Sequence, residues 1–459
     1  MIGEFTLSQI AHTYGGTIAH LDCSFSSVST DSRVLENGQI FVAIKGEKFD
    51  GHEFISLASK KVCGLVVEKP IPDIEISQWV VPDTIRALGQ IAKANRDKFN
   101  GYLIAVTGSC GKTTIKEMIS SILKKTGSVL FTKENSNNEI GVPSTLINIS
   151  AAHNYAVIEM GARSEGDIAY LCEIAKPDIA IINNILPAHL EGFGDIQNIA
   201  KAKGEIYRDL RNNGTAVINI DESHAQVWIK STNAKVITFS INNIQADFSA
   251  QNIILREDGY YNFTLTTPQG NTQINMPLRG KHNIANAVAS AACAHAAGAK
   301  LHIIRDGLNN LKQVDRRMEF SKLSPGLSLI DDSYNASPGS VKAAIDTLIE
   351  INGLRILILG DMAELGRDEI PLHADIGKYA LDAGVDIFLA VGPLSFYATK
   401  EFGAKSQHFN EKKELLNFLV DSKILNDDLP NLKKVILVKG SRFMAMEDIS
   451  NSIKNQGVI

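Results

Sequence analysis

The sequence predicts an α/β protein of three domains, each built on a sheet that is covered by helices. Its 459 residues correspond to about three domains of ordinary size. Short apolar runs alternate with stretches of helical spacing along most of the chain, which is typical of mainly parallel sheets. The composition agrees with a packed core, because 44% of the residues are hydrophobic and only 21% are charged.

Charge and cysteine usage exclude several classes of protein. The net charge is −5 and the basic residues are scattered, which argues against a nucleic-acid-binding face. We find no signal peptide and no apolar stretch of about 18 residues, so we expect no membrane span. The odd number of widely spaced cysteines favours reduced thiols in the cytoplasm and argues against a zinc site. They are Cys23, Cys63, Cys110, Cys172 and Cys293.

The first domain, residues 1–100, is predicted to be a small α/β unit that begins with a capped helix. We expect strands over 39–44 and 64–68 and a helix over 53–61. An amphipathic helix over 84–99, with Asp83 as its N-cap, would carry the chain into the next domain.

The central domain, residues 101–314, is predicted to hold a mainly parallel sheet. Its expected strands cover residues 102–107, 155–160, 178–183 and 215–220, with helical segments between them. Residues 246–277 have a different pattern, because the turns at Asp258-Gly259 and Pro268-Gln-Gly270 separate alternating segments. This part predicts a small antiparallel flap.

The last domain, residues 315–459, returns to alternating strands and helices. Strands are expected over 328–331, 355–359, 386–391 and 434–438, which indicates a Rossmann-like domain. No Gly-x-Gly-x-x-Gly follows any of these strands, so the shape need not bind a dinucleotide.

A glycine-rich turn joins the strand over 102–106 to a helix expected over 115–125. Such a turn directs backbone N–H groups and a helix N-terminus at one point, which suits a phosphate. The turn comprises Thr107, Gly108, Ser109, Cys110, Gly111, Lys112, Thr113 and Thr114. Lys112 would contact the outer phosphates and Thr113 would offer a hydroxyl to Mg²⁺, as in a P-loop. The general pattern has a glycine where this chain has Val106, and an ordinary glycine turn with a surface lysine is the alternative.

Other polar residues follow the predicted strands of the central domain, where an open α/β sheet binds its ligand. Glu159 could meet a Mg²⁺ ion that Thr113 holds. Taken one at a time, these residues also have purely structural explanations. Glu159 could be a capping residue, His189 a surface-loop histidine and Lys203 part of a solvated helix face.

Seven motifs in order make the sequence resemble the ATP-dependent Mur ligases of bacterial cell-wall synthesis. They are TGSCGKTT (107–114), ENSNNEIGVP (134–143), VIEMGAR (157–163), PAHLEGFG (187–194), AKAKGEIY (200–207), GKHNIANA (280–287) and DDSYNASP (331–338). The resemblance runs from Val28-Ser-Thr-Asp-Ser-Arg33 to Val438-Lys-Gly-Ser-Arg442. It implies a central P-loop-type domain that binds ATP. It also implies that D-alanyl-D-alanine is added to UDP-N-acetylmuramoyl-tripeptide through an acyl phosphate.

The resemblance implies two Mg²⁺ ions and a set of catalytic residues. Thr113 and Glu159 would hold one ion and His189 the other, and Lys203 matches a lysine that the family carries in carbamylated form. Lys112, Lys203, His189 and Arg317 are therefore the expected catalytic residues.

The nucleotide contacts implied by the resemblance lie in the last two domains. Asn283 would contact adenine, whereas Arg317 and Asp332 would contact the phosphate and the ribose. The family's usual Gly-Arg pair is Arg316-Arg317 here, and Ser337 stands where asparagine is more usual.

The expected substrate contacts come from three loops. Ser29, Thr30, Asp31, Ser32 and Arg33 form the first loop, and Lys45, Gly46 and Asp50 form the second. Their hydroxyls and charges suit a uracil edge and a diphosphate, although a capping and ion-pair cluster explains them equally well. The resemblance implies the UDP end of the substrate here, and Asn137, Asn138 and Tyr334 near the peptide and dipeptide.

Three other functions compete with this one. A ligase that adds the third peptide residue shares the chemistry, but its diaminopimelate version carries an Asp-Asn-Pro-Arg motif that is absent here. A folylpolyglutamate synthase shares the central fold but lacks a uridine-type first domain. A nucleotide-operated switch would not need a second metal site. We expect a monomeric enzyme with small-molecule substrates.

Overall fold

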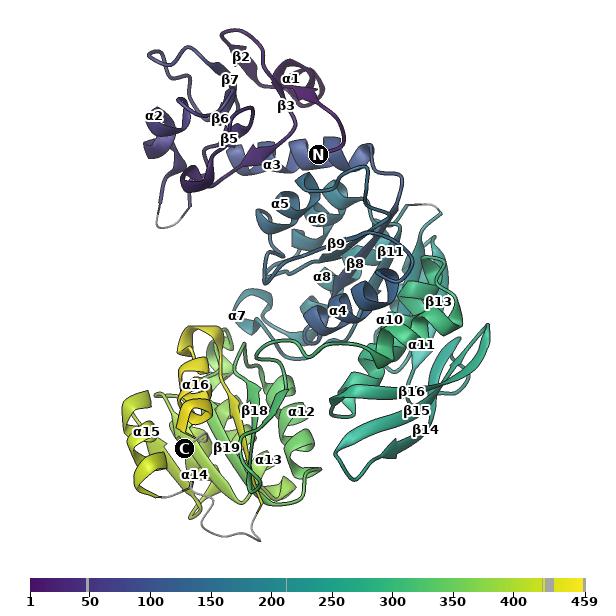
Figure 1. The fold of residues 1–459 in the computed structure, drawn as a ribbon, viewed down its shortest axis with the longest axis vertical. Helices are drawn as coiled ribbons and strands as arrows, with labels where there is room; N and C mark the ends of the chain where they lie inside the picture. The colour runs from purple at the N-terminus through teal and green to yellow at the C-terminus, as the bar shows by residue number, and fades with distance from the viewer. Residues whose placement is uncertain (47–48, 212, 423, 426–432, 457–459) are drawn as a thin grey trace.

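The computed structural model describes residues 1–46, 49–211, 213–422, 424–425 and 433–456. It has three domains that follow one another along the chain, and each is built on its own sheet (Figure 1). The first domain lies at one end of the elongated molecule, and the last domain packs beside the central one.

The first domain holds a sheet with the order β2-β7-β6-β5-β4 and a separate β1-β3 pair. The strands are β1 Phe5–Thr6, β2 Thr17–Ala19, β3 Ser24–Phe25, β4 Val28–Ser29, β5 Ile40–Val42, β6 Gly64–Val67 and β7 Ser77–Val80. The helices are α1 Leu7–Tyr14, η1 Ser32–Val34, η2 Gly51–Phe54 and α2 Ile55–Ala58. The two predicted strands are confirmed as β5 and β6. The helix predicted over 53–61 is shorter, because Asp50 caps a 3₁₀ turn that occupies its first residues.

The connecting helix α3 (Thr84–Asp97) begins where the sequence predicts. The Asp83 carboxylate accepts hydrogen bonds from the backbone N–H groups of Ile85 and Arg86. Near its other end, the fully buried Arg96 donates to the Ala175 carbonyl at 2.7 Å and to the Asp178 carboxylate at 2.9 Å. A charge buried in this way must be paired, so Arg96 fixes α3 against the central domain.

The central sheet has the order β16-β15-β14-β13-β12-β11-β8-β10-β9. Its strands are β8 Tyr102–Thr107, β9 Val129–Phe131, β10 Tyr155–Glu159, β11 Ile179–Ile182, β12 Thr215–Asn219, β13 Lys235–Ser240, β14 Phe248–Leu255, β15 Tyr260–Thr267 and β16 Gly270–Arg279. Its helices are α4 Lys112–Leu123, α5 Gly141–Ile147, α6 Asp167–Ala175, α7 Leu190–Phe193, α8 Ile196–Arg208, α9 Ala225–Ser231, α10 His282–Ala296 and α11 Leu301–Asn309. The pairs from β9 to β14 are parallel, and the four predicted strands are confirmed. Strand β8 lies between β10 and β11, so the chain order reverses there and leaves a crevice at the end of β8.

The predicted antiparallel flap is an extension of this sheet. Strand β15 pairs antiparallel with both β14 and β16, as expected. Strand β14 also pairs in parallel with β13, with Phe239 opposite Phe248. Both phenylalanines are buried, so the extension continues the apolar core and covers an edge that would otherwise be open.

The last domain has a six-stranded sheet with the order β17-β18-β22-β19-β20-β21. Its strands are β17 Glu319–Lys322, β18 Leu327–Asp332, β19 Leu354–Gly360, β20 Ile387–Val391, β21 Ser406–Phe409 and β22 Lys434–Lys439. Its helices are α12 Pro338–Ile349, η3 Gly366–Asp368, α13 Glu369–Ala383, α14 Ser395–Phe402, α15 Lys412–Asp421, η4 Arg442–Met444 and α16 Glu447–Gln456. All pairs are parallel except β17-β18, which confirms the predicted strand–helix alternation.

Within the described ranges, no helix is long and apolar enough to cross a membrane. All five cysteines are free.

Candidate active site

A cleft of about 1140 Å³ lies between the central and last domains. Its walls combine the loop after β8, the loops after β10 and β11, and the segments that follow β18, β19 and β22. Parallel strands of two domains therefore direct their carboxyl ends at one space. Such an edge is where open α/β sheets bind ligands.

The loop after β8 is held in shape by two asparagines that follow β11. Asn183 Nδ2 donates to the Cys110 carbonyl at 2.8 Å, and the Cys110 N–H donates to Asn184 Oδ1 at 2.9 Å. Gly111 has φ = +77°, and a Cβ atom there would lie 2.5 Å from Asn183 Nδ2. Only glycine fits this position, and it is the N-cap from which α4 starts at Lys112. The helix therefore begins three residues earlier than predicted.

The backbone N–H groups of the loop lie at the N-terminus of α4, where an anion is stabilised. Lys112 Nζ donates to the Gly108 carbonyl at 2.9 Å, so the ammonium lies back over the loop. Ser109, Thr113 and Thr114 line the cleft with it. Thr107 lies below them, with its hydroxyl bonded to the Met160 carbonyl at 2.8 Å.

Thr113 and Glu159 are brought together as the sequence predicts. The Thr113 hydroxyl donates to Glu159 Oε2 at 2.8 Å, and Asn137 Nδ2 donates to Glu159 Oε1 at the same distance. Glu159 is 3% exposed. A hydroxyl and a carboxylate that meet in this way are the hard oxygen donors that suit Mg²⁺.

Lys203 lies on α8 and is buried at 1% exposure, behind the cleft rather than in its lining. Its ammonium makes no hydrogen bond or ion pair with any described residue, and the Phe193 ring lies 5.9 Å away. Burial, followed by the nearby charge of Lys112, lowers the pKa of Lys203 to about 7. Such a side chain is not a solvated helix residue.

His189 does not meet Glu159 but pairs with the last domain. Its Nδ1 forms an ion pair with the Glu364 carboxylate, which also lies 3.7 Å from Arg163. Hydrogen bonding with His189 holds the pKa of Glu364 below its usual range. Both His189 and Glu364 have φ near +60°, so this contact is made from a strained backbone on each side. Among the described residues, no three His, Cys, Asp or Glu side chains form a metal cluster.

The residues expected at the nucleoside all line the cleft. Arg317 stacks over the Tyr334 ring at 4.1 Å, and Asp332 lines the cleft beside them. Asn283 also reaches the lining, although its amide is bonded inward. Its Nδ2 donates to the Arg279 carbonyl and its Oδ1 accepts from Asn286.

The loops of the first domain do not reach this cleft, whose described lining runs from Ser109 to Phe443. Asp31 caps η1 by accepting from the Arg33 N–H and also accepts two hydrogen bonds from the exposed Arg33 guanidinium, which lowers the pKa of Asp31 to about 2. Ser29 bonds the Asp31 backbone at 3.1 Å. In this structure the Ser29–Arg33 loop is thus bonded to itself.

The second loop of the first domain has a similar arrangement. The backbones of Lys45 and Asp50 pair in an isolated antiparallel β-bridge. The Asp50 carboxylate accepts a hydrogen bond from His52 Nδ1 at 2.7 Å. Gly46 donates to the Phe49 carbonyl. Residues 47–48 between them lie outside the described part of the chain.

The asparagines of the 134–143 motif line the cleft beside the phosphate loop. Asn137 contacts Glu159, as described above. Asn138 Oδ1 accepts from the Gly141 N–H at 2.9 Å and so orients the start of α5. Asn138 therefore holds the turn before α5 and also lines the cleft.

Sequence reasoning missed Glu364, Lys439 and the role of Asn183. Glu364 follows β19, Lys439 is the last residue of β22, and Asn183 follows β11. The rule that polar residues at strand carboxyl ends form the site would have indicated them, had it been applied to every strand.

Most of the chain matches two domains of a known protein family. Residues 106–294 match the Mur ligase middle domain, and residues 316–454 match the Mur ligase, glutamate ligase domain. The chain is 42% identical over 454 residues to the UDP-N-acetylmuramoyl-tripeptide--D-alanyl-D-alanine ligase of Escherichia coli (strain K12). That match covers 98% of this chain and 99% of the relative.

Solved structures agree with these relatives. MurF from Acinetobacter baumannii superposes with a TM-score of 0.92 at 35% identity, covering 99% of both chains. The MurF ligase of Thermotoga maritima, solved in complex with ADP, has a TM-score of 0.82 at 25% identity. It covers 94% of this chain and 97% of its own.

Arg316, which replaces the family's usual glycine, adopts a backbone conformation that favours glycine. Its φ is +58°, and its guanidinium lies 3.1 Å from the Glu447 carboxylate. The Arg316 carbonyl also accepts from the Tyr334 N–H at 3.2 Å. The interdomain turn thus places a non-glycine residue in the left-handed region, and an ion pair holds its side chain.

We predict that Arg316→Gly is about 1 kcal/mol more stable to urea than Arg316→Ala. Both variants lose the ion pair with Glu447. Alanine is strained in the left-handed conformation of this position, whereas glycine adopts it without strain. Equal free energies of unfolding for the two variants would show that the turn carries no strain.

Proposed function

The chain belongs to the Mur ligase family, and on that basis we propose that it adds D-alanyl-D-alanine to UDP-N-acetylmuramoyl-tripeptide with conversion of ATP to ADP and phosphate. The observation that carries this proposal is the cleft itself. A phosphate loop, the Thr113–Glu159 pair and the expected nucleoside contacts face one space. The relative from Thermotoga maritima was solved in complex with ADP, which supports nucleotide binding.

The reaction needs a carboxylate to be activated, because a free carboxylate does not condense with an amine in water. Transfer of the γ-phosphoryl group of ATP to the terminal carboxylate of the tripeptide gives an acyl phosphate. The neutral amine of D-alanyl-D-alanine then attacks the acyl carbon and phosphate leaves. Lys112 and the N–H groups of the loop would stabilise the charge on the transferred group.

Thr113 and Glu159 fit a Mg²⁺ ion, since their oxygens already meet at 2.8 Å in a buried position. Bound Mg²⁺ would neutralise charge on the phosphates and orient them. We propose His189 as a ligand of a second ion, for which it would have to exchange its partner Glu364.

Lys203 is suited to take up CO₂. The buried amine has no hydrogen-bond or ion-pair partner among the described residues, and its pKa is lowered to about 7, so a large share of it is uncharged near neutral pH. The lone pair of the neutral amine forms a bond to the carbon of CO₂ and a proton leaves, so that an anionic carbamate replaces the neutral amine. We propose that this carbamate supplies an oxygen ligand to a Mg²⁺ ion.

The substrates would approach the cleft from two sides. We propose that the Ser29–Arg33 and Lys45–Asp50 loops bind the UDP end, while the peptide extends toward Asn137, Asn138 and Tyr334. We propose that the enzyme acts as a monomer. Free cysteines and the use of ATP support a cytoplasmic location.

The alternative functions are not favoured. The full-length relatives carry the name of the D-alanyl-D-alanine-adding ligase. The solved diaminopimelate ligase and the solved folylpolyglutamate synthases are 20% or less identical to this chain and share only its fold.

We predict that phosphate release requires both UDP-N-acetylmuramoyl-tripeptide and D-alanyl-D-alanine, and that Lys112→Ala abolishes it. The variant loses the charge over the loop, whereas Lys124→Ala, a change at the other end of α4, should retain wild-type turnover. A colorimetric phosphate assay measures both. Release without the dipeptide at the full rate, or normal turnover by Lys112→Ala, would contradict the assignment.

We predict that Lys203→Ala is nearly inactive and is partly restored by added short-chain carboxylic acids. The acid would occupy the volume of the missing side chain and return an anionic oxygen. Lys201→Ala is the matched control, because Lys201 is exposed on the same helix and pairs with Glu165. A fully active Lys203→Ala enzyme would exclude a role for the carbamate.

A further inference from the structure

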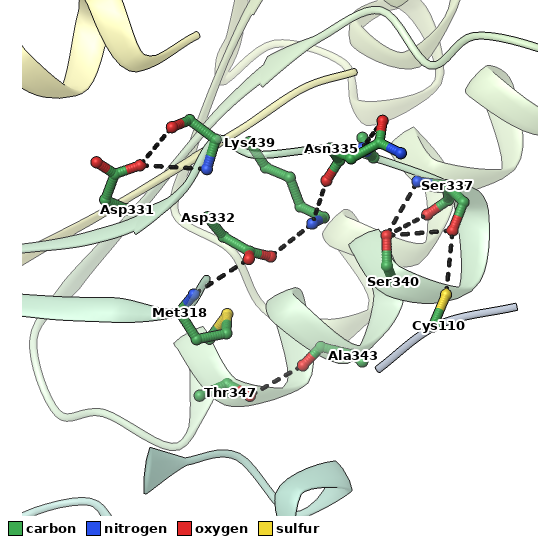
Figure 2. A network of polar contacts seen from close by, with 12 residues as sticks. Cys110, Met318, Asp331, Asp332, Asn335, Ser337, Ser340, Ala343, Thr347 and Lys439 are labelled. Atoms are coloured by element: carbon green, nitrogen blue, oxygen red, sulfur yellow. Dashed lines mark hydrogen bonds and ion pairs between the residues drawn. The ribbon is translucent and has the colours of Figure 1, made fainter. Parts of the chain in front are cut away.

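Lys439 is a buried lysine at the carboxyl end of β22, next to the expected nucleoside contacts. It is 2% exposed, and its Nζ donates to Asp332 Oδ2 at 2.5 Å and to the Asn335 carbonyl at 2.8 Å (Figure 2). A charge buried to this extent is retained only where it is paired, so the Lys439–Asp332 contact is a defined part of the site.

Asp332 is held at both of its carboxylate oxygens. Lys439 contacts Oδ2, and the Met318 N–H donates to Oδ1 at 3.1 Å (Figure 2). Met318 directly follows Arg317, which stacks over Tyr334. The orientation of the Asp332 carboxylate is therefore set by protein groups before any ligand is bound.

The second contact of Lys439 fixes the loop that leads back to the phosphates. Asn335 Oδ1 accepts from the Ala336 N–H at 2.9 Å, and the loop ends at Ser337. There the Ser337 hydroxyl lies 3.3 Å from Cys110 Sγ of the phosphate loop (Figure 2). The Lys439 side chain thus supports both the Asp332 carboxylate and the loop that contacts the phosphate loop across the cleft.

We propose that Lys439 is a positioning residue for ATP: it holds the Asp332 carboxylate toward the ribose and anchors the 332–337 loop against the phosphate loop. This inference rests on the proposed function for the identity of the ligand. Without Lys439, the Asp332 carboxylate keeps only one of its two supports and the loop loses its anchor. The nucleotide then binds less tightly, whereas the UDP-sugar site in the first domain is unaffected.

Binding of a fluorescent ADP analogue to the full-length chain tests the proposal. Lys439→Met should weaken binding by about 10-fold or more, the effect of a lost charge-assisted hydrogen bond. Asp332→Asn should have a similar effect. Because Lys439 acts through Asp332, the double variant should bind within about twofold of Asp332→Asn. Wild-type affinity of Lys439→Met, or effects that multiply in the double variant, would overturn the proposal, the latter showing that Lys439 contacts the nucleotide independently.

Two further variants keep the test informative. Lys454→Met removes ion pairs with Glu319 and Asp331 in the same domain and should bind the analogue within twofold of wild type. Lys439→Gln should show the same loss as Lys439→Met and replaces it if the methionine variant does not fold.

The steady-state readout separates positioning from a general loss of structure. In Lys439→Met, the KM for ATP should rise while the KM for UDP-N-acetylmuramoyl-tripeptide stays within twofold; an equal rise in both would overturn the proposal. If the wild-type chain binds the analogue but releases no phosphate with the paired substrates, the proposed function fails. In that case, the affinities of the variants for the ADP analogue still decide whether Lys439 positions the nucleotide.

Discussion

The site depends on a chain of buried side-chain amides that holds the phosphate loop. Asn183 bonds the Cys110 carbonyl and Asn286 Oδ1, Asn286 bonds Asn283, and Asn283 bonds the Arg279 carbonyl. Each of these buried amides is hydrogen-bonded to the next, so the position of each depends on its neighbours. This chain ties the loop after β8 to the start of α10. The shape that receives phosphates is thereby linked to the end of the cleft expected to receive adenine.

A second constraint is that neither domain completes the cleft by itself. The central domain supplies the phosphate loop and Glu159, whereas Arg317 and Asp332 come from the last domain. Contacts between Cys110 and Ser337 and between His189 and Glu364 close the two domains on each other. An acyl phosphate survives only where water is excluded, and a cleft formed by two closing domains provides this exclusion.

Local patterns predicted much of this arrangement. The phosphate loop, the Asp83 cap and the strands of the last two domains follow from residues that are close in sequence. The antiparallel flap was predicted, but its attachment to the central sheet was not, because the pairing of β13 with β14 is not encoded in the alternation of either strand. The partners of His189 and Lys439 were also invisible, since Glu364 and Asp332 lie more than a hundred residues away. Only the folded chain brings these charges together. The lowered pKa of Lys203 likewise follows from burial, which helical spacing alone did not reveal.

The central claim is that this cleft transfers a phosphoryl group to the tripeptide carboxylate. Tripeptide labelled with ¹⁸O in its terminal carboxylate tests it directly, by mass spectrometry of the products after one turnover with ATP and D-alanyl-D-alanine. The account predicts one ¹⁸O atom in each released phosphate, because the carboxylate oxygen that accepts the phosphoryl group leaves with it. Unlabelled phosphate, or ¹⁸O recovered in AMP, would contradict it.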